Sequence, residues 1–409
     1  MIKKIVIIFI LLITNIYSQK LYDIIVAQDG SGDYKTITEA INSLPMFNYH
    51  RVTIYIKSGI YNEKIRIDQD YITLKGEDKE NTKIIYSQLR EDWNKNQDNI
   101  GPGVINIYGD DIILENLSIE NSQPEVGPHA FAIYGFGTRT IILNCNVISK
   151  GADTVSLWNY KEGMYYHANC YFEGAVDFVC PRGWCFIRDS KFYEVKETAA
   201  IWHAGSYDKT QKFVIVNSYF DGVKNFELGR HHYEAQFYLI NCKFSKNMAD
   251  KPIYRVTYDD PSRNRQFIWG PRYYFYNSHC DSIDYAWIQN NLKDSEEIDN
   301  PDKISAFWTF NYKWDPEATT KVLLKNFYIN NNKLILQFNE PVTVIGTPIF
   351  KTTNGIVFMF ASGGENDTIE LVTENNFNKE DLIGLQLIND AKIFSSLASI
   401  NPRYIELNF

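Results

Sequence analysis

Two aspartates, 24 residues apart, are the side chains of this sequence whose surroundings most suggest acid–base or nucleophilic chemistry. Asp153 lies in the segment GADTVSLW, and Asp177 lies in FEGAVDFVCPRG. The second segment predicts a short β-strand that runs into a Pro-Gly turn, with Asp177 inside the strand between Val176 and Phe178. A carboxylate among apolar neighbours requires either a polar partner or a chemical role.

A four-part signature recurs through the middle of the chain: an apolar strand, then Asn or Asp, a small residue and a strand-forming residue. Successive copies are 28, 25, 20, 28, 24 and 36 residues apart. This period, without helical spacing, predicts a solenoid of parallel strands whose equivalent residues stack about 4.8 Å apart. The alternative is a chance series of short strands in a sandwich. Stacked amides turned inward would form a hydrogen-bonded ladder. The ladder positions are Asn116, Asn144, Asn169, Asp189, Asn217, Asn241 and Asn277.

The two aspartates occupy nearly equivalent places in this repeat. Asp153 follows Asn144 by nine residues, and Asp177 follows Asn169 by eight. We therefore expect their carboxylates on one face of adjacent rungs, roughly 5 Å apart. Two such groups do not both ionise readily, so one pKa rises and the other stays low, as for a general acid beside a nucleophile or base. The alternative for each aspartate is a structural place in a turn or in the polar ladder.

A third candidate is Arg230, in the segment LGRHH, 13 residues after Asn217. We expect it in a glycine-containing turn from which its guanidinium reaches the carboxylate face. There it would hold one aspartate ionised or bind an acidic ligand through bidentate hydrogen bonds. The alternative is an arginine that is simply solvated in its turn.

A short helix and a second all-β unit flank the repeats. Residues 36–44 form an amphipathic stretch that predicts a helix covering the open end of the solenoid. Residues 52–86 alternate strands and turns, and after WDPEATT (314–320) the texture changes to antiparallel strands with polar turns. The expected organisation is an export signal at 1–18, a parallel β-helix at 19–316 and a small Ig-like β-sandwich accessory domain at 317–409.

The first 18 residues have the layout of a secretory signal, with Lys3 and Lys4, an apolar run and Ser18. We expect an exported monomer without a membrane span in the mature chain.

The formal charge of −9, which becomes more negative once the two signal lysines are lost, argues against nucleic acid as a partner. Six cysteines without a CxxC pair argue against zinc, and they suit either disulfides or buried core positions. No metal or other cofactor is expected.

Four segments together resemble the pectin methylesterase family, which are right-handed parallel β-helices. AQDGSGDYKTITEAI resembles the family's opening motif, and GADTVSLW resembles its Gly-x-Gln-Asp-Thr-Leu motif. FEGAVDFVCPRG resembles Gly-x-Val-Asp-Phe-Ile-Phe-Gly, and LGRHH resembles Leu-Gly-Arg-Pro-Trp. The motifs occur in the family's order, and the resemblance covers roughly residues 22–316.

The resemblance implies an enzyme that hydrolyses methyl esters of galacturonic acid residues in pectin without a cofactor. Asp177 would attack the ester carbonyl as the nucleophile. Asp153 would protonate departing methanol and then activate water, while Arg230 would keep Asp177 ionised and oriented. The partner is thus a pectic polysaccharide.

The sequence departs from the family at the residues that stabilise the oxyanion and stack on sugar. Ala152 replaces the glutamine before the acid/base aspartate, and His129 in GPHAFAIY replaces a second glutamine. His129 would donate a hydrogen bond in its place, either as the neutral ring or as the imidazolium. His232 replaces the stacking tryptophan. These changes suggest an unusual pectic ester, such as one in a branched pectin. Candidate substrate-binding side chains are Trp158, His232, Trp202, Tyr207 and Trp184.

Three other readings compete with a methylesterase. Paired carboxylates also cleave glycosides, as in a polygalacturonase-like hydrolase. Ala152 suits a degenerate protein that binds pectin without catalysis. An esterase for another acyl group, such as acetyl, is the third alternative.

Overall fold

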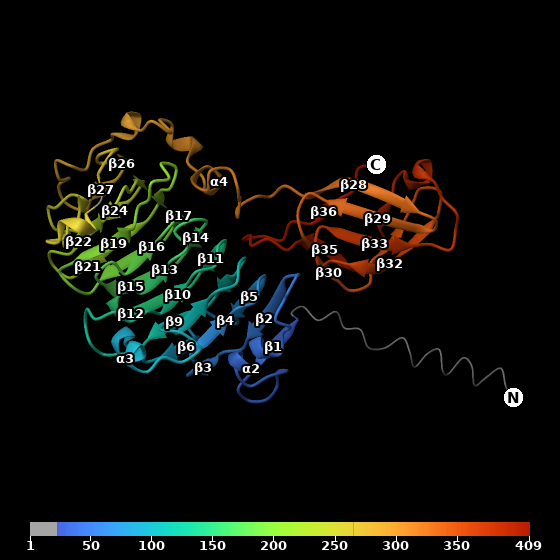
Figure 1. The fold of residues 1–409 in the computed structure, drawn as a ribbon, viewed down its shortest axis with the longest axis horizontal. Helices are drawn as coiled ribbons and strands as arrows, with labels where there is room; N and C mark the ends of the chain where they lie inside the picture. The colour runs from blue at the N-terminus through green and yellow to red at the C-terminus, as the bar shows by residue number, and fades with distance from the viewer. Residues whose placement is uncertain (1–22, 265) are drawn as a thin grey trace.

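The computed structural model describes residues 23–264 and 266–409, so the expected export signal at 1–18 lies outside the described residues. Most of the chain winds through three parallel sheets stacked as a coil (Figure 1). Each turn of the coil passes from the ten-stranded sheet A to the nine-stranded sheet B and then to the eight-stranded sheet C. The fold is a right-handed parallel β-helix, which confirms the predicted solenoid.

Sheet A comprises β1 (Ile24–Val26), β2 (Val52–Ile56), β5 (Ile72–Gly76), β8 (Ile113–Glu115), β11 (Thr140–Leu143), β14 (Met164–Ala168), β17 (Trp184–Arg188), β20 (Phe213–Val216), β23 (Phe237–Ile240) and β26 (Tyr273–Tyr276). Sheet B comprises β3 (Gly59–Tyr61), β6 (Thr82–Tyr86), β9 (Ser118–Asn121), β12 (Asn146–Ala152), β15 (Tyr171–Ala175), β18 (Lys191–Glu194), β21 (Tyr219–Gly222), β24 (Lys243–Phe244) and β27 (His279–Cys280). Sheet C comprises β4 (Ile65–Ile67), β7 (Ile105–Ile107), β10 (Ile133–Gly135), β13 (Val155–Leu157), β16 (Val179–Pro181), β19 (Ala199–His203), β22 (Glu227–His231) and β25 (Tyr254–Arg255).

The polar ladder exists, but the prediction that its amides turn inward is wrong. All seven ladder residues have φ between 45° and 55°, so each occupies a left-handed turn between sheets A and B. Asn144 donates to Asn116 at 2.7 Å and Asn277 donates to Asn241 at 2.9 Å, on the outer side of the wall. The small residue that follows points into the core instead, because successive side chains leave the turn on opposite sides. Five of the six cysteines are buried and all six are free thiols, so the core reading of the cysteines is confirmed.

The expected N-terminal cap is α2 (Ile37–Asn42), which packs beside β1 and β4 at the end of the coil (Figure 1). Thr36 and Glu39 form a capping box at its start. Its buried Ile37 and Ile41 join the core of the coil, so α2 shields the first rung from solvent. The other helical segments are α3 (Arg90–Lys95), η1 (Pro261–Arg263), η2 (Leu292–Asp294), η3 (Pro301–Lys303), α4 (Ala306–Thr309) and η4 (Lys379–Leu382).

A second domain of mostly antiparallel strands follows the coil. Its seven-stranded sheet and its two-stranded sheet contribute to one apolar core, which confirms a small β-sandwich. Its likeness to an immunoglobulin fold and the boundary between residues 316 and 317 stay predictions. Its strands are β28 (Val322–Asn330), β29 (Lys333–Phe338), β30 (Val342–Ile345), β31 (Ile349–Lys351), β32 (Val357–Gly363), β33 (Thr368–Val372), β34 (Gln386–Leu387), β35 (Lys392–Ser395) and β36 (Ile405–Glu406).

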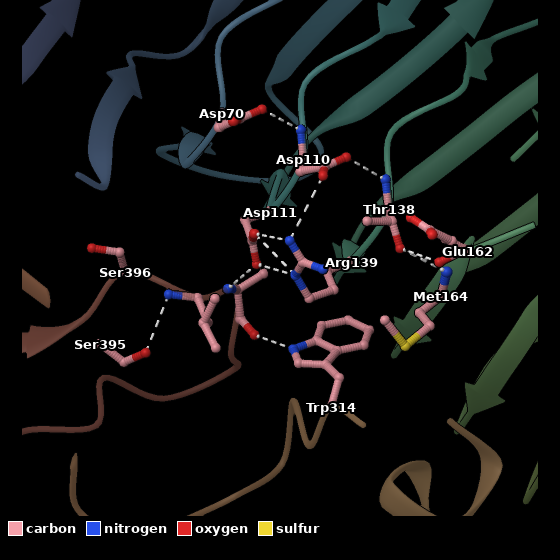
Figure 2. Close-up of polar contacts among 12 residues, drawn as sticks. Asp70, Asp110, Asp111, Thr138, Arg139, Glu162, Met164, Trp314, Ser395 and Ser396 are labelled. Atoms are coloured by element: carbon pink, nitrogen blue, oxygen red, sulfur yellow. Dashed lines mark hydrogen bonds and ion pairs between the residues drawn. The ribbon is translucent and has the colours of Figure 1, made fainter. Parts of the chain in front are cut away.

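The second domain docks on the turns that lead into sheet A (Figure 2). The buried Asp111 carboxylate accepts hydrogen bonds from Arg139 at 2.7 and 3.0 Å and from the Ala398 N–H at 2.9 Å. The Trp314 indole donates to the Ala398 carbonyl at 2.9 Å, and Arg51 donates to the Ser396 carbonyl at 2.8 Å. This contact lies at the sheet C to sheet A corner, whereas the two aspartates lie at the sheet B to sheet C corner. Within the described residues, no helix is long and apolar enough to cross a membrane.

Candidate active site

Asp153 and Asp177 lie in matching turns where the chain passes from sheet B to sheet C. Both residues adopt the left-handed conformation, with φ of 59° and 58°. The prediction that Asp177 lies inside a strand is wrong, because β15 ends at Ala175 and β16 begins at Val179. Asp and Asn adopt this conformation more readily than most other residues.

The sheet register confirms that the two aspartates are equivalent residues of consecutive rungs. Ala152 pairs with Ala175 before the turn, and Val155 pairs with Val179 after it. The Asp153 N–H also donates to the Val176 carbonyl at 3.2 Å. Adjacent strands lie about 4.8 Å apart, so the two carboxyl groups are neighbours on one face.

Arg230 binds Asp177 through a forked contact. Its Nε donates to Oδ1 at 2.8 Å and to Oδ2 at 3.1 Å, and its Nη2 donates to Oδ2 at 2.7 Å. The expectation of a turn position is wrong, because Arg230 lies within β22. The strand fixes its backbone, and the long side chain reaches back to the aspartate. Such charge-assisted, bidentate pairs are strong and strictly oriented.

Burial and neighbouring arginines act in opposite directions on the pKa values of the two carboxyl groups. Burial raises the pKa of Asp153 to about 6, against the opposing charges of Arg182 and Arg90. Burial also raises the pKa of Asp177 to about 6, with Arg230 opposing the rise and Asp153 adding to it. The two pKa values are thus raised alike, and the guanidinium fork, which contacts Asp177 alone, favours the ionised form of Asp177 over that of Asp153.

The turn that carries Asp177 is strained, and polar side chains hydrogen-bond its backbone. Val176 has a φ of 44°, which is unfavourable for a β-branched residue. Its N–H donates to Thr198 Oγ1 at 3.2 Å. The fully buried Glu194 interacts with Thr198 and with the Val176 backbone, and burial raises the pKa of Glu194 to about 9. A neutral carboxyl group therefore supports the turn that carries Asp177 near neutral pH.

His129 lies beside Asp153, as the alignment of motifs predicts. Its Nε2 is 4.0 Å from Asp153 Oδ2, and its side chain is 49% exposed. Burial and the nearby Arg90 lower the pKa of His129, although Asp177 opposes this. Of the two forms considered from the sequence, the neutral ring with one N–H donor is therefore the form near neutral pH. Its backbone also pairs with Ala152, so the two positions that differ from the family's glutamines are adjacent.

The outer face of sheet C carries a row of aromatic rings beside the carboxyl groups. The Trp158 indole donates to Ser156 Oγ at 2.7 Å, and that hydroxyl lies 3.4 Å from Asp153 Oδ2. Trp202 packs edge-on against His232, with ring centroids 5.4 Å apart. Trp158, Trp202 and His232 thus lie at the site.

Two other residues proposed for substrate binding do not lie on this row. Trp184 belongs to β17 in sheet A, where it is only 2% exposed and packs under the segment that contains α4. The prediction that Trp184 contacts substrate is therefore wrong, because the chain turns from sheet C to sheet A between Pro181 and Trp184. Tyr207 lies half exposed between β19 and β20, and its role stays a prediction.

Sequence reasoning missed two arginines at this site. The Arg182 guanidinium lies 3.7 Å from the ring centroid of Trp158 and 4.7 Å from that of Trp202. The Arg90 guanidinium lies 5.9 Å from Trp158. A signal for Arg182 was present in the spacing, because Arg182 follows Trp158 by the same 24 residues that separate the two aspartates.

Comparisons with known proteins agree with this parallel β-helix architecture. The pectinesterase family model matches residues 23–236, more than half of the chain. Pectinesterase 31 of Arabidopsis thaliana is 30% identical over 202 residues, 47% of this chain and 58% of that protein. The chain spans about half the length of the curated relatives that it matches.

Two solved structures show the same fold at low sequence identity. Pectin methylesterase PemA from Erwinia chrysanthemi has a TM-score of 0.56 at 20% identity, over 72% of this chain and 98% of that chain. A pectin methylesterase in complex with a hexasaccharide has a TM-score of 0.55 at 19% identity, over 73% of this chain and 99% of that chain. The family match establishes that this chain belongs to the pectinesterase family.

Proposed function

We propose that this protein is an esterase that hydrolyses methyl esters of galacturonic acid residues in pectin, with Asp177 as nucleophile and Asp153 as acid/base. The observation that carries the proposal is the aspartate pair on consecutive rungs, with the Arg230 fork on one member only. Membership of the pectinesterase family supports the reaction class. A solved relative in complex with a hexasaccharide supports a saccharide substrate.

In the first half of the reaction, an Asp177 carboxylate oxygen attacks the ester carbonyl carbon. The carbonyl electrons move to oxygen, and a tetrahedral oxyanion forms. When the oxyanion collapses, the bond to the methoxy oxygen breaks and Asp153 gives its proton to that oxygen, so methanol leaves. The products of this half are an acyl–Asp177 anhydride and an ionised Asp153.

In the second half, Asp153 accepts a proton from water as the water oxygen attacks the same carbonyl carbon. Collapse of the second tetrahedral intermediate breaks the bond to Asp177. This releases a free galacturonate carboxyl group, restores ionised Asp177 and leaves Asp153 protonated. The raised pKa of Asp153, about 6, suits a group that must give and take a proton in each turnover.

Stabilisation of the oxyanion falls to His129 in this proposal. Its position beside Asp153 and its neutral ring support one N–H donor aimed at the developing charge. Ala152 supplies no side-chain donor, so the site relies on fewer amides than the family pattern. Each lost donor costs roughly 10²- to 10³-fold in rate.

The test is product analysis with wild-type protein and Asp177→Asn on methyl-esterified homogalacturonan and on branched pectins. We expect methanol without new reducing ends from the wild type, and a loss of at least about 10³-fold in Asp177→Asn. Lys191→Ala, an exposed change on sheet B, is the matched control. New reducing ends would instead identify a glycoside hydrolase, acetate would identify another esterase, and binding without products would identify a non-catalytic protein.

We also propose that the protein is exported and that its preferred ester lies within a branched pectin. The changes at Ala152, His129 and His232 support the second point, because they alter the residues nearest the reacting sugar. Faster methanol release from plain methylated homogalacturonan than from branched pectins would contradict it.

A further inference from the structure

A cleft of about 690 Å³ lies between the first rungs of the coil and the second domain. The coil contributes the loop between α2 and β2 and the turn between β4 and β5, and the second domain contributes Pro341, Glu365 and Asn366. Ligand sites often lie between domains, and this volume is in the usual range for one. The reaction proposed above does not use this cleft.

The loop between α2 and β2 presents aromatic rings to the cleft from an anchored backbone. Phe47 is 69% exposed and Tyr49 is 51% exposed. Asn48, only 5% exposed, holds the loop, because its Nδ2 donates to the His50 carbonyl at 2.7 Å and to the Asp70 carbonyl at 2.8 Å. Exposed rings that are held in place in this way are typical of a surface that a ligand covers.

The contact between the two domains fixes the opposite wall of the cleft. The Arg51 N–H donates to Thr343 Oγ1 at 2.8 Å, and the Val342 N–H donates to the Asn366 carbonyl at 3.0 Å. Because Pro341 directly precedes these two residues, Pro341 and Asn366 are held at a set place relative to the loop. The cleft therefore forms where the second domain docks.

The polar groups of the cleft are acidic or neutral. Among the described residues, no lysine, arginine or histidine lines it. Asp70 accepts a hydrogen bond from the Asp110 N–H at 2.7 Å through Oδ1 (Figure 2). In the described part of the chain, Asp70 Oδ2, the Glu365 carboxylate and Asn366 Nδ2 have no hydrogen-bond partner. Such a lining repels an acidic chain, whereas the hydroxyl groups of a neutral ligand can donate to these oxygens.

The cleft lies three rungs from the aspartate pair, toward the N-terminal end of the coil. Asp68, which lines the cleft, directly follows β4, and sheet C leads from β4 through β7 and β10 to β13, the strand after Asp153. Three strand spacings and the length of one short strand separate the two places by roughly 15–20 Å. A polysaccharide seated at the aspartates can therefore reach the cleft with a side branch of a few sugar residues.

We propose that the cleft binds a neutral saccharide side branch of pectin and thereby selects a branched substrate. The inference rests on the proposed function for the identity of the polysaccharide. The rings of Phe47 and Tyr49 cover the C–H face of a sugar, and Asp70, Glu365 and Asn366 exchange hydrogen bonds with its hydroxyl groups. A neutral branch suits this lining better than the galacturonate backbone, because the backbone carries the same charge as the cleft. The second domain thus takes part in substrate choice, since it supplies one wall of the site.

The experiment measures binding of two neutral probes, galactotetraose and arabinotetraose, by NMR titration with wild-type protein, Phe47→Ala, Tyr49→Ala and Glu365→Gln. The matched control is Tyr328→Ala, which removes a ring of similar exposure, 53%, from β28. We expect wild type and Tyr328→Ala to bind at least one probe equally well. Each ring variant should weaken that binding roughly 2- to 10-fold, and Glu365→Gln should weaken it a few-fold. Added salt should leave the affinity unchanged, because the probes carry no charge.

A third probe, tetralysine, represents a basic partner. Tetralysine binding that Glu365→Gln abolishes, in a protein that binds neither saccharide, would overturn the inference in favour of a basic peptide. The inference would also be wrong if wild type bound neither saccharide at millimolar concentration, or if Phe47→Ala and Tyr49→Ala bound them as wild type does. Thermal melting of each variant checks that it is folded.

Methanol release separates this inference from the proposed function. We expect Phe47→Ala and Tyr49→Ala to lose more kcat/KM on a branched pectin than on plain methylated homogalacturonan. Equal losses on both substrates would overturn the inference and leave the esterase assignment in place. Saccharide binding that depends on Phe47 and Tyr49, in a wild-type protein that releases no methanol, would instead refute the proposed function and leave the saccharide site standing.

Discussion

Replacing Arg230 with methionine should raise the pKa of Asp177 above that of Asp153. In the native site, three N–H···O contacts at 2.7 to 3.1 Å favour the ionised form of Asp177. Methionine keeps an unbranched chain of similar length but removes the charge and the donors. Asp177 would then bind a proton more tightly than Asp153 does.

The size of the effect follows from the pKa of Asp177, which is about 6 with the fork in place. An adjacent opposite charge typically lowers a carboxyl pKa by about 1–3 units, so its loss should raise the Asp177 pKa to about 8. The ionised fraction at pH 7 would fall from about 90% to about 10%. We therefore expect a loss of about tenfold in kcat/KM at pH 7 from ionisation alone, with further loss because the carboxylate is no longer oriented.

The assay is methanol release across pH 4–9 by wild type, Arg230→Met and Arg230→Lys. The acidic limb of the kcat/KM profile should move upward by about 2 pH units in Arg230→Met. Arg230→Lys keeps the charge without the fork, so its limb should stay near that of the wild type while its maximum rate falls. An acidic limb that does not move in Arg230→Met, with activity at pH 7 within twofold of wild type, would refute the assignment of Asp177 as the group that Arg230 holds ionised.

Three further changes test the surroundings of the site. His129→Ala should lower kcat for methanol release by about 10²- to 10³-fold. His129→Gln should retain much of the activity, because an amide side chain also donates a hydrogen bond. Equal losses of kcat in the two variants would exclude a donor role for His129. The raised pKa of Glu194, about 9, means that its stabilisation is present below pH ~4.5 and declines as pH rises toward 9. Glu194→Gln should therefore flatten the fall in unfolding free energy between pH 5 and 9, measured by urea denaturation, and an unchanged slope would contradict a protonated Glu194. Asp111→Asn should lower the unfolding free energy by about 3 kcal/mol and speed proteolytic release of the second domain, while the more exposed Asp110→Asn should do neither.

The repeat was predictable because each rung contains a turn that only certain residue types accept. Only a few residues accept a left-handed turn without strain, so Asn or Asp recurs at Asn116, Asn144 and the later ladder positions. The rung spacing then places Asp153 over Asp177. The sequence carried no comparable signal for the direction in which the ladder side chains point, since an amide is satisfied equally by a stacked neighbour inside or outside the wall.

The errors concern corners of the coil, where chain direction changes within one or two residues. Asp177 has strand-forming neighbours, yet Val176 takes a φ that no strand pattern would indicate. Trp184 follows Asp177 closely in sequence but lies on a different sheet, because Gly183 turns the chain between them at a φ of 89°. Arg182 reads as an ordinary turn residue unless its column partner Trp158 is considered.

The column that contains the aspartates explains why a distant strand supplies the arginine. The Asp177 N–H donates to the Ala199 carbonyl at 2.6 Å, and Ala199 pairs with Glu227, so the column runs Asp153, Asp177, Ala199, Glu227. A bulky residue on the third rung would fill the space above Asp177. Ala199 has only a methyl side chain, which suits the Arg230 side chain that starts from the fourth rung and binds the Asp177 carboxylate on the second. The aspartate pair arises because one turn position is repeated on two consecutive rungs. The two aspartates differ because the next rung has Ala199 at that position, and only Asp177 lies next to that rung and receives the Arg230 fork.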